Sequence, residues 1–232
     1  MGIFLWVMTC AEKPMSSELG PPVNPGKTLN VAFVVVDSVY NSELVAPMDV
    51  FHHTRFHTQK GMNVFTVALN DTLITTFEGL KLKPDYTIPY DSLPAIDVLV
   101  VPSAAHSMDS DLQNEELISF VTKAGRQAQY VMSLCDGSFV LAQAGLLTHY
   151  ECTTFPGDVD RFERTFPELT IHRDVSFVHD RKFLTSAGGA KSYEVALYLT
   201  ELLYGKSVAT RIGEGLVISW DLSAVAYVRS AH

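Results

Sequence analysis

The stretch that decides the fold is YVMSLCDGSFVL, residues 130–141. An apolar run leads into Cys135, and an apolar pattern with helical spacing follows it. The residues two before and two after the cysteine, Ser133 and Gly137, are small. This order predicts a nucleophile elbow, a sharp turn from strand to helix at which the two backbones nearly touch and one reactive side chain is exposed.

Cys135 is therefore the candidate catalytic nucleophile. At the N-terminus of a helix, backbone N–H groups and the helix dipole favour the thiolate, so we expect an activated thiol. The other interpretation is a buried, inert thiol, which is the more common fate of a lone cysteine. The remaining cysteines are Cys10 and Cys152, and we expect Cys152 to be such a structural thiol.

Alternating strand and helix signals surround the elbow. Continuous apolar runs predict strands buried on both faces, and segments with helical spacing separate them. The sequence therefore predicts an α/β fold, a mostly parallel sheet with helices on both faces. The expected strands are 29–36, 62–69, 97–101 and 129–134, the expected helices are 42–56, 114–128, 136–147, 158–166 and 192–204, short β segments lie within 73–90, and 177–179 with 183–185 form a hairpin.

Active sites of such sheets lie at the carboxyl ends of the strands. We therefore expect the turn after Val36, the turn after Val101 and the elbow at Cys135 to converge. Residues 185–189, TSAGG, lack the lysine and the spacing of a P-loop. We expect them to shape a turn or to line the pocket wall.

Composition narrows the classes of partner. The chain has 232 residues, 47% of them hydrophobic, and a formal net charge of -9, which is typical of one compact acidic domain. The sequence has no basic run and no basic recognition helix, which argues against binding to nucleic acid or anionic membranes. The cysteines lack zinc-type spacing, and His53 and His57 have no third ligand in the pattern, so we expect no metal site.

Residues 1–28 are expected to lie outside the domain. The segment 11–27 is rich in Pro, Ser and Gly, as in a flexible tail. Residues 7–10, VMTC, loosely resemble a lipoprotein cleavage site. We expect a cytoplasmic protein with a flexible N-terminal tail, and the alternative is a periplasmic lipoprotein anchored through Cys10 after a lipoprotein-type leader.

Four segments resemble the ThiJ/PfpI superfamily, also called the DJ-one superfamily, within the class I glutamine amidotransferase-like fold. The resemblance runs from about Leu29 to Ile218 and is most like the isocyanide (isonitrile) hydratases and the related domains of AraC-type regulators. The segments are 43–51 (ELVAPMDVF), 97–102 (DVLVVP), 133–147 and 177–197.

The resemblance implies a flavodoxin-like three-layer sandwich forming a single domain over residues 29–232. It implies that Cys135 is the nucleophile and that Glu43 is protonated, donates a hydrogen bond to the sulfur and acts as a general acid and base. It also implies no metal or organic cofactor, a small-molecule substrate and a homodimer. The other interpretation of Glu43 is a carboxylate that the dipole favours at a helix N-terminus.

The sequence departs from the family pattern on both sides of the elbow. Asp136 follows the cysteine where protease-like members carry a histidine. A carboxylate beside a thiol opposes thiolate formation unless it points away as a helix cap. Residues 153–156 read TTFP, so Phe155 stands where many members have another histidine. The missing Cys–His pair argues against a protease.

The oxyanion loop is the third departure, because the usual Pro-Gly-Gly reads PSAAH at residues 102–106. Ser103 and Ala104 must then aim their N–H groups at the substrate without the freedom of glycine. His106 either replaces the missing base at the mouth of the pocket or is an ordinary surface histidine. The residues expected around Cys135 are Ser103, Ala104, Asp136, Gly137, Phe155 and Ser186.

Two functions remain open. In the first, Cys135 attacks the terminal carbon of an isonitrile, Glu43 supplies protons, and water releases an N-substituted formamide. A glyoxalase-like action on α-oxoaldehydes would need a base that the sequence lacks. The alternative is a non-catalytic ligand- or redox-sensing module, since the oxyanion loop is altered and an exposed thiolate oxidises readily.

Overall fold

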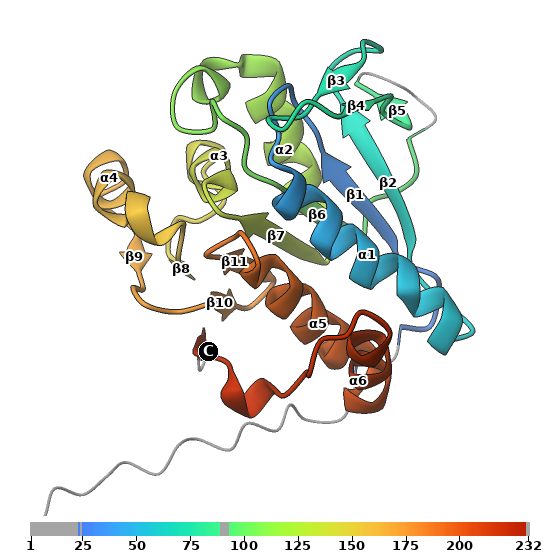
Figure 1. Cartoon of the computed structure of the whole chain (residues 1–232). Coiled ribbons are helices and arrows are strands. Elements are labelled where there is room, and N and C mark those ends of the chain that lie inside the picture. The colour runs from blue at the N-terminus through green and yellow to red at the C-terminus, as the bar shows by residue number, and fades with distance from the viewer. Residues whose placement is uncertain (1–22, 24, 89–92, 231–232) are drawn as a thin grey trace, which may run out of the picture.

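The computed structural model describes residue 23, residues 25–88 and residues 93–230 (Figure 1). The expectations for a leader and an anchor at Cys10 lie outside these residues. Within the described part of the chain, no helix combines the length and the apolarity that crossing a bilayer requires.

A single large sheet forms the middle of the fold (Figure 1). Its strands are β1 (Asn30–Val34), β2 (Asn63–Ala68), β5 (Tyr86–Thr87), β6 (Val98–Val101), β7 (Tyr130–Leu134), β10 (Phe177–Asp180), β11 (Phe183–Ser186) and β12 (Tyr227–Arg229). They lie in the order β12-β10-β11-β7-β6-β1-β2-β5. Every neighbouring pair is parallel except β10 with β11, which form the expected antiparallel hairpin. The sheet ends in two very short strands, β5 and β12.

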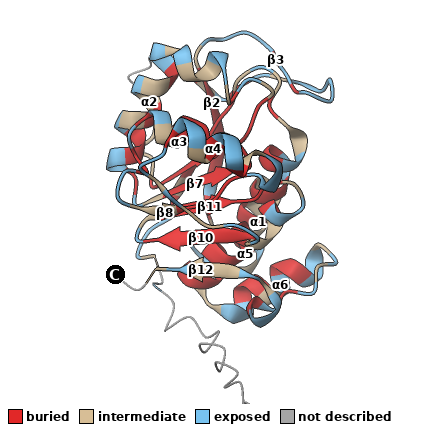
Figure 2. Ribbon diagram, turned by 90° about the vertical axis from the view of Figure 1, so that its left-hand side faces the viewer, coloured by how far each residue is buried: buried red, intermediate tan, exposed pale blue. Residues whose placement is uncertain are grey.

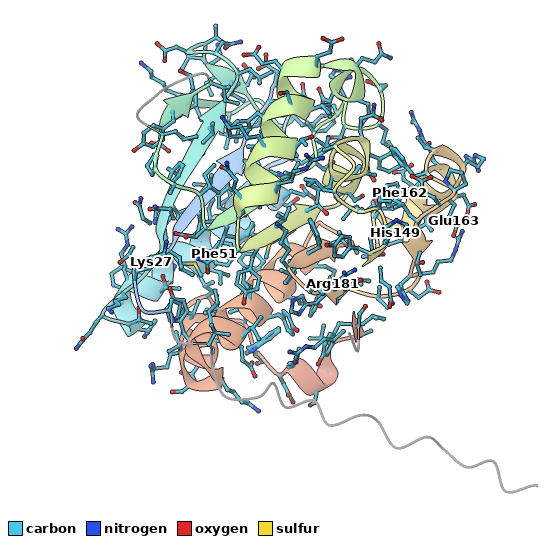
Figure 3. All side chains as sticks on the ribbon, turned by 180° about the vertical axis from the view of Figure 1, so that it is seen from behind. Lys27, Phe51, His149, Phe162, Glu163 and Arg181 are labelled. Atoms are coloured by element: carbon cyan, nitrogen blue, oxygen red, sulfur yellow. The ribbon has the colours of Figure 1, made fainter. Side chains whose placement is uncertain are left out.

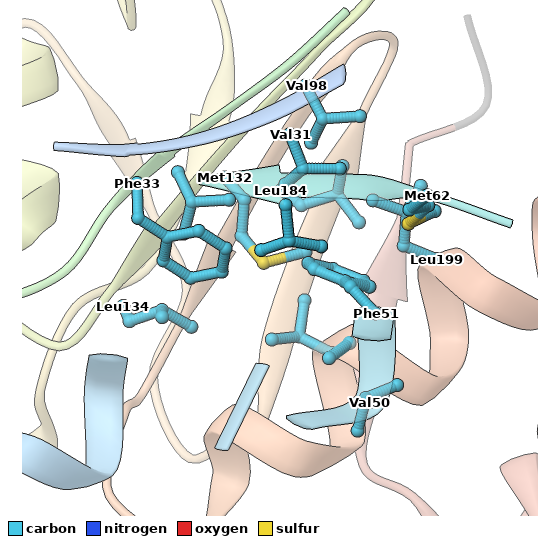
Figure 4. Close-up of a cluster of buried hydrophobic side chains, with 14 of the residues drawn as sticks. Val31, Phe33, Val50, Phe51, Met62, Val98, Met132, Leu134, Leu184 and Leu199 are labelled. Atoms are coloured by element: carbon cyan, nitrogen blue, oxygen red, sulfur yellow. The ribbon is translucent and has the colours of Figure 1, made fainter. Parts of the chain in front are cut away.

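Helices cover both faces of this sheet. One layer holds α1 (Asn41–His57), α5 (Lys191–Tyr204) and α6 (Lys206–Gly215), and the other holds α2 (Glu115–Gln127), α3 (Gly137–Gln143) and α4 (Val159–Thr165). Side chains of β1 alternate between the layers, because successive residues of a strand point to opposite faces. Val31 and Phe33 pack in the α1 and α5 layer (Figure 4), and Ala32 and Val34 pack in the other. The predicted flavodoxin-like three-layer sandwich is confirmed.

Burial explains why the strands read as continuous apolar runs. Both faces of the sheet are covered, so the strands are buried while the outer faces of the helices are exposed (Figure 2). Phe33 and Phe51 lie at 0% exposure in one core cluster, and Phe139 and Phe162 do so in the other. Burying one such side chain stabilises the fold by about 1.5–3 kcal/mol.

The β10–β11 hairpin is fixed at its turn by charged side chains. The guanidinium of Arg181 donates to the His149 carbonyl at 2.8 Å and to the Asp180 carboxylate at 3.1 Å (Figure 3). The Lys182 ammonium donates to the carbonyls of Gly125 and Arg126 at the end of α2, a favourable place for a cation. These contacts hold β11 in place beside β7, next to the elbow.

Four parts of the fold differ from the expectation. The helix after the elbow ends at Gln143 rather than residue 147, because Gly145 reverses the backbone at a φ of 65°. Helix α6, strand β12 and the small sheet of β8 (Glu151–Cys152) with β9 (Thr170–Ile171) were not expected. A second small sheet, β3 (Ile74–Thr75) with β4 (Lys81–Leu82), lies within residues 73–90, where short β segments were expected. Short 3-10 helices, η1 (Ser110–Gln113), η2 (Pro156–Asp158) and η3 (Leu222–Ala224), complete the structure.

Candidate active site

Cys135 stands at a sharp turn between β7 and α3, as the sequence predicts. Its φ is 53°, a left-handed conformation that costs a non-glycine residue free energy and is concentrated at functional sites. The Cys135 N–H donates to the Ser186 carbonyl at 2.9 Å, which fixes the turn against β11. The cysteine is 8% exposed, so the sulfur lies in a nearly closed site.

Two glycines allow the backbone to pass this close to the elbow. A Cβ on Gly137 would lie 2.1 Å from the Val101 carbonyl oxygen, so the predicted need for a small residue at this position is confirmed. A Cβ on Gly188 would lie 2.3 Å from the Cβ of Cys135. Gly188 and Gly189 have φ values of 78° and 55°. The 185–189 segment therefore turns against the cysteine, one of the two roles expected for it.

The three expected loops do converge. Ala104 forms a β-bridge with Val39, the Ala105 N–H donates to the Ser38 carbonyl, and the Tyr40 N–H donates to the Ser103 carbonyl. The register of β6 and β7 pairs Val101 with Ser133, two residues before Ser103 and Cys135, and the Ser103 hydroxyl acts on the Cys135 thiol. The turn after β1, the turn after β6 and the elbow therefore form one site.

The thiol of Cys135 is not an activated thiolate in this structure. Burial raises the pKa of Cys135 well above its ordinary value, and the charges of Asp136 and Glu43 act in the same direction. The backbone N–H of Asp136 and the Ser103 hydroxyl lower it without outweighing burial. The expectation that the helix N-terminus favours the thiolate is therefore contradicted in this conformation, because burial and the charges of Asp136 and Glu43 outweigh the backbone N–H.

Asp136 faces the thiol instead of capping α3. The Cys135 S–H donates to its Oδ2 at 3.7 Å, and the Thr154 hydroxyl is 3.1 Å from its Oδ1. Burial first, and then the charge of Asp158, raise the pKa of Asp136 to about 6. Helix α3 has no side-chain cap, so the cap interpretation of Asp136 is excluded for this conformation.

Glu43 lies in the first turn of α1 and is 4% exposed. Its Oε1 accepts a hydrogen bond from the Gly189 N–H at 2.7 Å, and its Oε2 accepts one from the Ser42 hydroxyl at 2.8 Å. Among the described residues, no hydrogen bond joins Glu43 to the Cys135 sulfur. The carboxyl therefore acts on the thiol through its charge and through the glycine turn, and its role as a proton donor stays a prediction.

Replacing Glu43 by glutamine is expected to lower the pKa of the Cys135 thiol by about one unit, because the amide keeps an acceptor for Gly189 and loses the negative charge. The measurement is the rate of iodoacetamide labelling of Cys135 at pH 8, read by mass spectrometry of its peptide, which should rise about tenfold because the thiolate fraction rises tenfold per unit of pKa. A labelling rate identical to that of the parent protein would place Glu43 outside the electrostatic reach of the sulfur.

Replacing Asp136 by asparagine is expected to stabilise the fold more at pH 8 than at pH 4.5. A folded-state pKa of about 6 lies above the unfolded value, so the native state binds more protons and loses stability as pH rises through about 4 to 6. The asparagine variant escapes this loss and should gain about 2 kcal/mol between the two pH values relative to the parent. Urea unfolding at both pH values measures the gain, and an equal effect at both would contradict it.

In the oxyanion loop, one backbone N–H group already donates a hydrogen bond within the protein. The Ala104 N–H donates to the Ser107 hydroxyl at 2.8 Å, so in this conformation it does not point to a substrate. The Ser103 side chain is fully buried, and its Oγ has no nitrogen or oxygen partner within the described residues. The Ser103 hydroxyl is thus the polar group of the loop that acts on the sulfur. The sequence pattern pointed to the N–H of Ser103 and not to this hydroxyl.

Of the remaining expected residues, Ser186 lies beside the cysteine, whereas Phe155 and His106 are exposed. Ser186 is near the cysteine through its carbonyl, whereas its hydroxyl donates to Ser176. Phe155 follows Thr154 and is 43% exposed. The side chain of His106 is more than half exposed, lies 3.4 Å from Asp109, and has no described contact with Cys135, which is the surface interpretation.

Sequence reasoning missed Tyr40 and Thr154. Burial raises the pKa of Tyr40, and the charges of Cys135, Asp136 and Glu43 add to this, so the tyrosine lies within their electrostatic reach. The Thr154 hydroxyl contacts Asp136 and the Cys135 carbonyl. Tyr40 directly precedes α1, the helix that carries Glu43, and Thr154 directly precedes Phe155. Both residues therefore lie next to segments that the sequence pattern had indicated.

Within the described residues, the elbow is neither a metal site nor part of the cavity beside α2. The described residues contain no group of three His, Cys, Asp or Glu side chains placed to hold a metal ion. A cavity of about 500 Å³ lies between α2 and the segment before β6, where Ile88, Leu93, Phe120 and Lys123 are among its lining residues. None of its described lining residues is a cysteine or a histidine, so we assign the chemistry to the elbow and not to this cavity.

A mostly parallel sheet with a cysteine on a strained strand-to-helix turn defines the class of cysteine-elbow α/β proteins. Within that class, this chain belongs to the DJ-1/PfpI family, whose pattern matches residues 29–202. The resemblance seen in the sequence is therefore confirmed.

Individual relatives differ in what they do. The chain is 29% identical over 181 residues to an isonitrile hydratase of Pseudomonas putida, covering 78% of this chain and 75% of the hydratase. It is 26% identical over 198 residues to the HTH-type transcriptional regulator GbdR of Pseudomonas aeruginosa, covering 84% of this chain but 52% of the regulator, about half its length. DJ-1beta of Drosophila melanogaster has the same fold, with a TM-score of 0.71 at 18% identity over 83% of this chain and 100% of that one. The homodimer and the lack of a nucleic-acid partner stay predictions.

Proposed function

We propose that this protein is a cysteine-dependent enzyme that hydrates a small isonitrile to an N-substituted formamide. The observation that carries the proposal is the pairing of a protonated Cys135 thiol with the Asp136 carboxyl at 3.7 Å. The isonitrile hydratase among the relatives supports the same reaction.

An isonitrile suits a thiol that keeps its proton. The terminal carbon of R–NC carries a lone pair and accepts a proton, and the same carbon then accepts a nucleophile. A nearby acid with a pKa close to neutral is the group that general acid–base catalysis needs, and Asp136 has a pKa of about 6. The raised pKa of Cys135 therefore does not oppose this reaction as it would oppose attack by a free thiolate.

The proposed steps conserve atoms and electrons. The Cys135 proton passes through Asp136 to the isonitrile carbon while sulfur forms a bond to that carbon, which gives a thioimidate, R–N=CH–S–Cys. Water then adds to the carbon, with its proton moving to nitrogen through Asp136 or Glu43. The C–S bond breaks, sulfur recovers a proton, and R–NH–CHO leaves.

The oxyanion loop also favours this substrate over an acyl group or an aldehyde. Attack on a carbonyl places negative charge on oxygen at the first step, and backbone N–H donors normally stabilise it. The Ala104 N–H is engaged by Ser107. Addition to an isonitrile gives a neutral thioimidate first, so the missing donor matters less.

The test is incubation of the purified protein with cyclohexyl isonitrile and, separately, with methylglyoxal. Formation of N-cyclohexylformamide, followed by NMR and gaining one ¹⁸O atom in ¹⁸O-labelled water, supports the proposal. Lactate from methylglyoxal without formamide would instead indicate the glyoxalase-like reaction and overturn it.

The non-catalytic ligand- or redox-sensing module remains the second candidate. The raised pKa of Cys135 and the engaged Ala104 N–H favour it, because neither helps a nucleophile. No turnover of either compound, together with saturable binding of the isonitrile, would make this module the better description.

A further inference from the structure

The reacting sulfur is surrounded by acidic groups. Asp136 Oδ2 accepts the thiol hydrogen bond, and Glu43 accepts the N–H of Gly189, the residue after the Gly188 backbone that packs on Cys135. Both carboxyl groups belong to residues that are 6% exposed or less. Water therefore screens their charge poorly.

Two further acidic residues extend this cluster. The Glu78 carboxylate accepts the Asn41 N–H at 3.1 Å, at the start of α1, and its charge acts on Tyr40. The charge of Asp158 acts on Asp136. The charged groups that act most strongly on Cys135, Asp136 and Tyr40 are all acidic.

Two basic side chains near the site, Lys191 and His106, already lie beside carboxylates. Lys191, in the first turn of α5, lies 2.6 Å from Glu194 and is about half exposed. The ring of His106 lies beside Asp109. Among the described residues, the charges that act on the sulfur include no lysine, arginine or histidine, so an anion arriving there would meet no countercharge from them.

We propose that the two buried carboxyl groups of Glu43 and Asp136 select substrates by charge, so that Cys135 reacts with neutral electrophiles and rejects those carrying a carboxylate or a phosphate. The inference rests on the proposed function for its substrate class, which becomes neutral alkyl or aryl isonitriles. The physical cause is repulsion between like charges in a site of low effective dielectric constant, which is strong over a few ångströms.

The experiment compares two alkylating reagents of nearly equal shape, neutral iodoacetamide and anionic iodoacetate. Both are attacked by the same thiolate, which displaces iodide, so the thiolate fraction cancels from the ratio of their rates. The rate at Cys135 is read by mass spectrometry of its peptide at pH 8. The reference is the same peptide in the chain unfolded in urea.

We expect the native ratio of iodoacetamide to iodoacetate rates to exceed the unfolded ratio by about tenfold or more. Asp136→Asn and Glu43→Gln should each reduce that excess several-fold, because each removes one negative charge and keeps the shape. Glu214→Gln is the matched control, since it removes the same charge from an exposed residue of α6 and should leave the ratio unchanged.

A native ratio equal to the unfolded ratio would overturn the inference. An equal fall in the ratio for Glu214→Gln would assign the effect to net charge and overturn it too. Failure of isonitrile turnover with a retained high ratio would reject the proposed reaction and leave charge selection standing. Turnover of a neutral isonitrile and of isocyanoacetate at equal kcat/KM would reject charge selection alone.

Discussion

The Cys135→Ser variant is expected to form formamide from an isonitrile at least about a thousandfold more slowly than the parent protein. Serine fills the same turn but its hydroxyl is a far weaker acid and nucleophile than a thiol. The proton relay to Asp136 at 3.7 Å then has no thiol proton to move, and no thioimidate forms. Product formation followed by NMR under saturating substrate measures the loss.

The matched control is Cys152→Ser. Cys152 is fully buried, and its S–H contacts the Thr170 carbonyl at 3.6 Å on the small β8–β9 sheet, away from the elbow. A serine hydroxyl can donate to the same carbonyl, so activity should stay close to that of the parent. Equal activity in Cys135→Ser and the parent would remove the nucleophile from the proposal.

The Gly188→Ala variant is expected to lower the free energy of unfolding by about 3–5 kcal/mol. Its φ of 78° already disfavours a side chain, at a cost of about 1–2 kcal/mol. The new Cβ would also lie 2.3 Å from the Cys135 Cβ and 2.8 Å from the Cys135 backbone N, which forces either the turn or the elbow to move. Urea unfolding of the two proteins measures the difference.

Gly189→Ala separates the backbone cost of a positive φ from the cost of the contact with Cys135. Gly189 has a positive φ of 55°, and a Cβ there would meet nothing within 4 Å. Its N–H stays available to Glu43, so only the backbone cost of about 1–2 kcal/mol should appear. Similar losses in the two variants would show that the contact with Cys135 contributes little to the cost.

The sequence predicted the sheet well because its strands are buried on both faces. A continuous apolar run such as residues 97–101 is typical of a strand covered on both faces, and β6 occupies Val98–Val101. Helix α6 was missed because Gly205, at a φ of 90°, ends α5 and directly precedes α6, so one glycine hides a second helix. Strand β12 was missed because three residues carry too little pattern to be recognised.

The site was predictable in position but not in its hydrogen bonds. Small residues around Cys135 reveal the elbow, since the close backbones permit nothing larger at Gly137. Whether Asp136 faces the sulfur or caps α3 depends on Thr154, which is distant in sequence. Likewise, the partner of the Ala104 N–H is a serine side chain three residues on, and only the folded loop decides between it and a substrate.

The two short strands at the ends of the sheet have a consequence for the protein in concentrated solution. A β-sheet can grow by adding a strand from another molecule wherever an edge offers a row of unpaired backbone groups. At one end β12 offers three residues, which is too little length for a foreign strand to find a stable register. At the other end β5 pairs only with Val67 and Ala68 of the longer β2. Addition of a foreign strand is therefore disfavoured at the β12 end of the sheet and not at the β2 end.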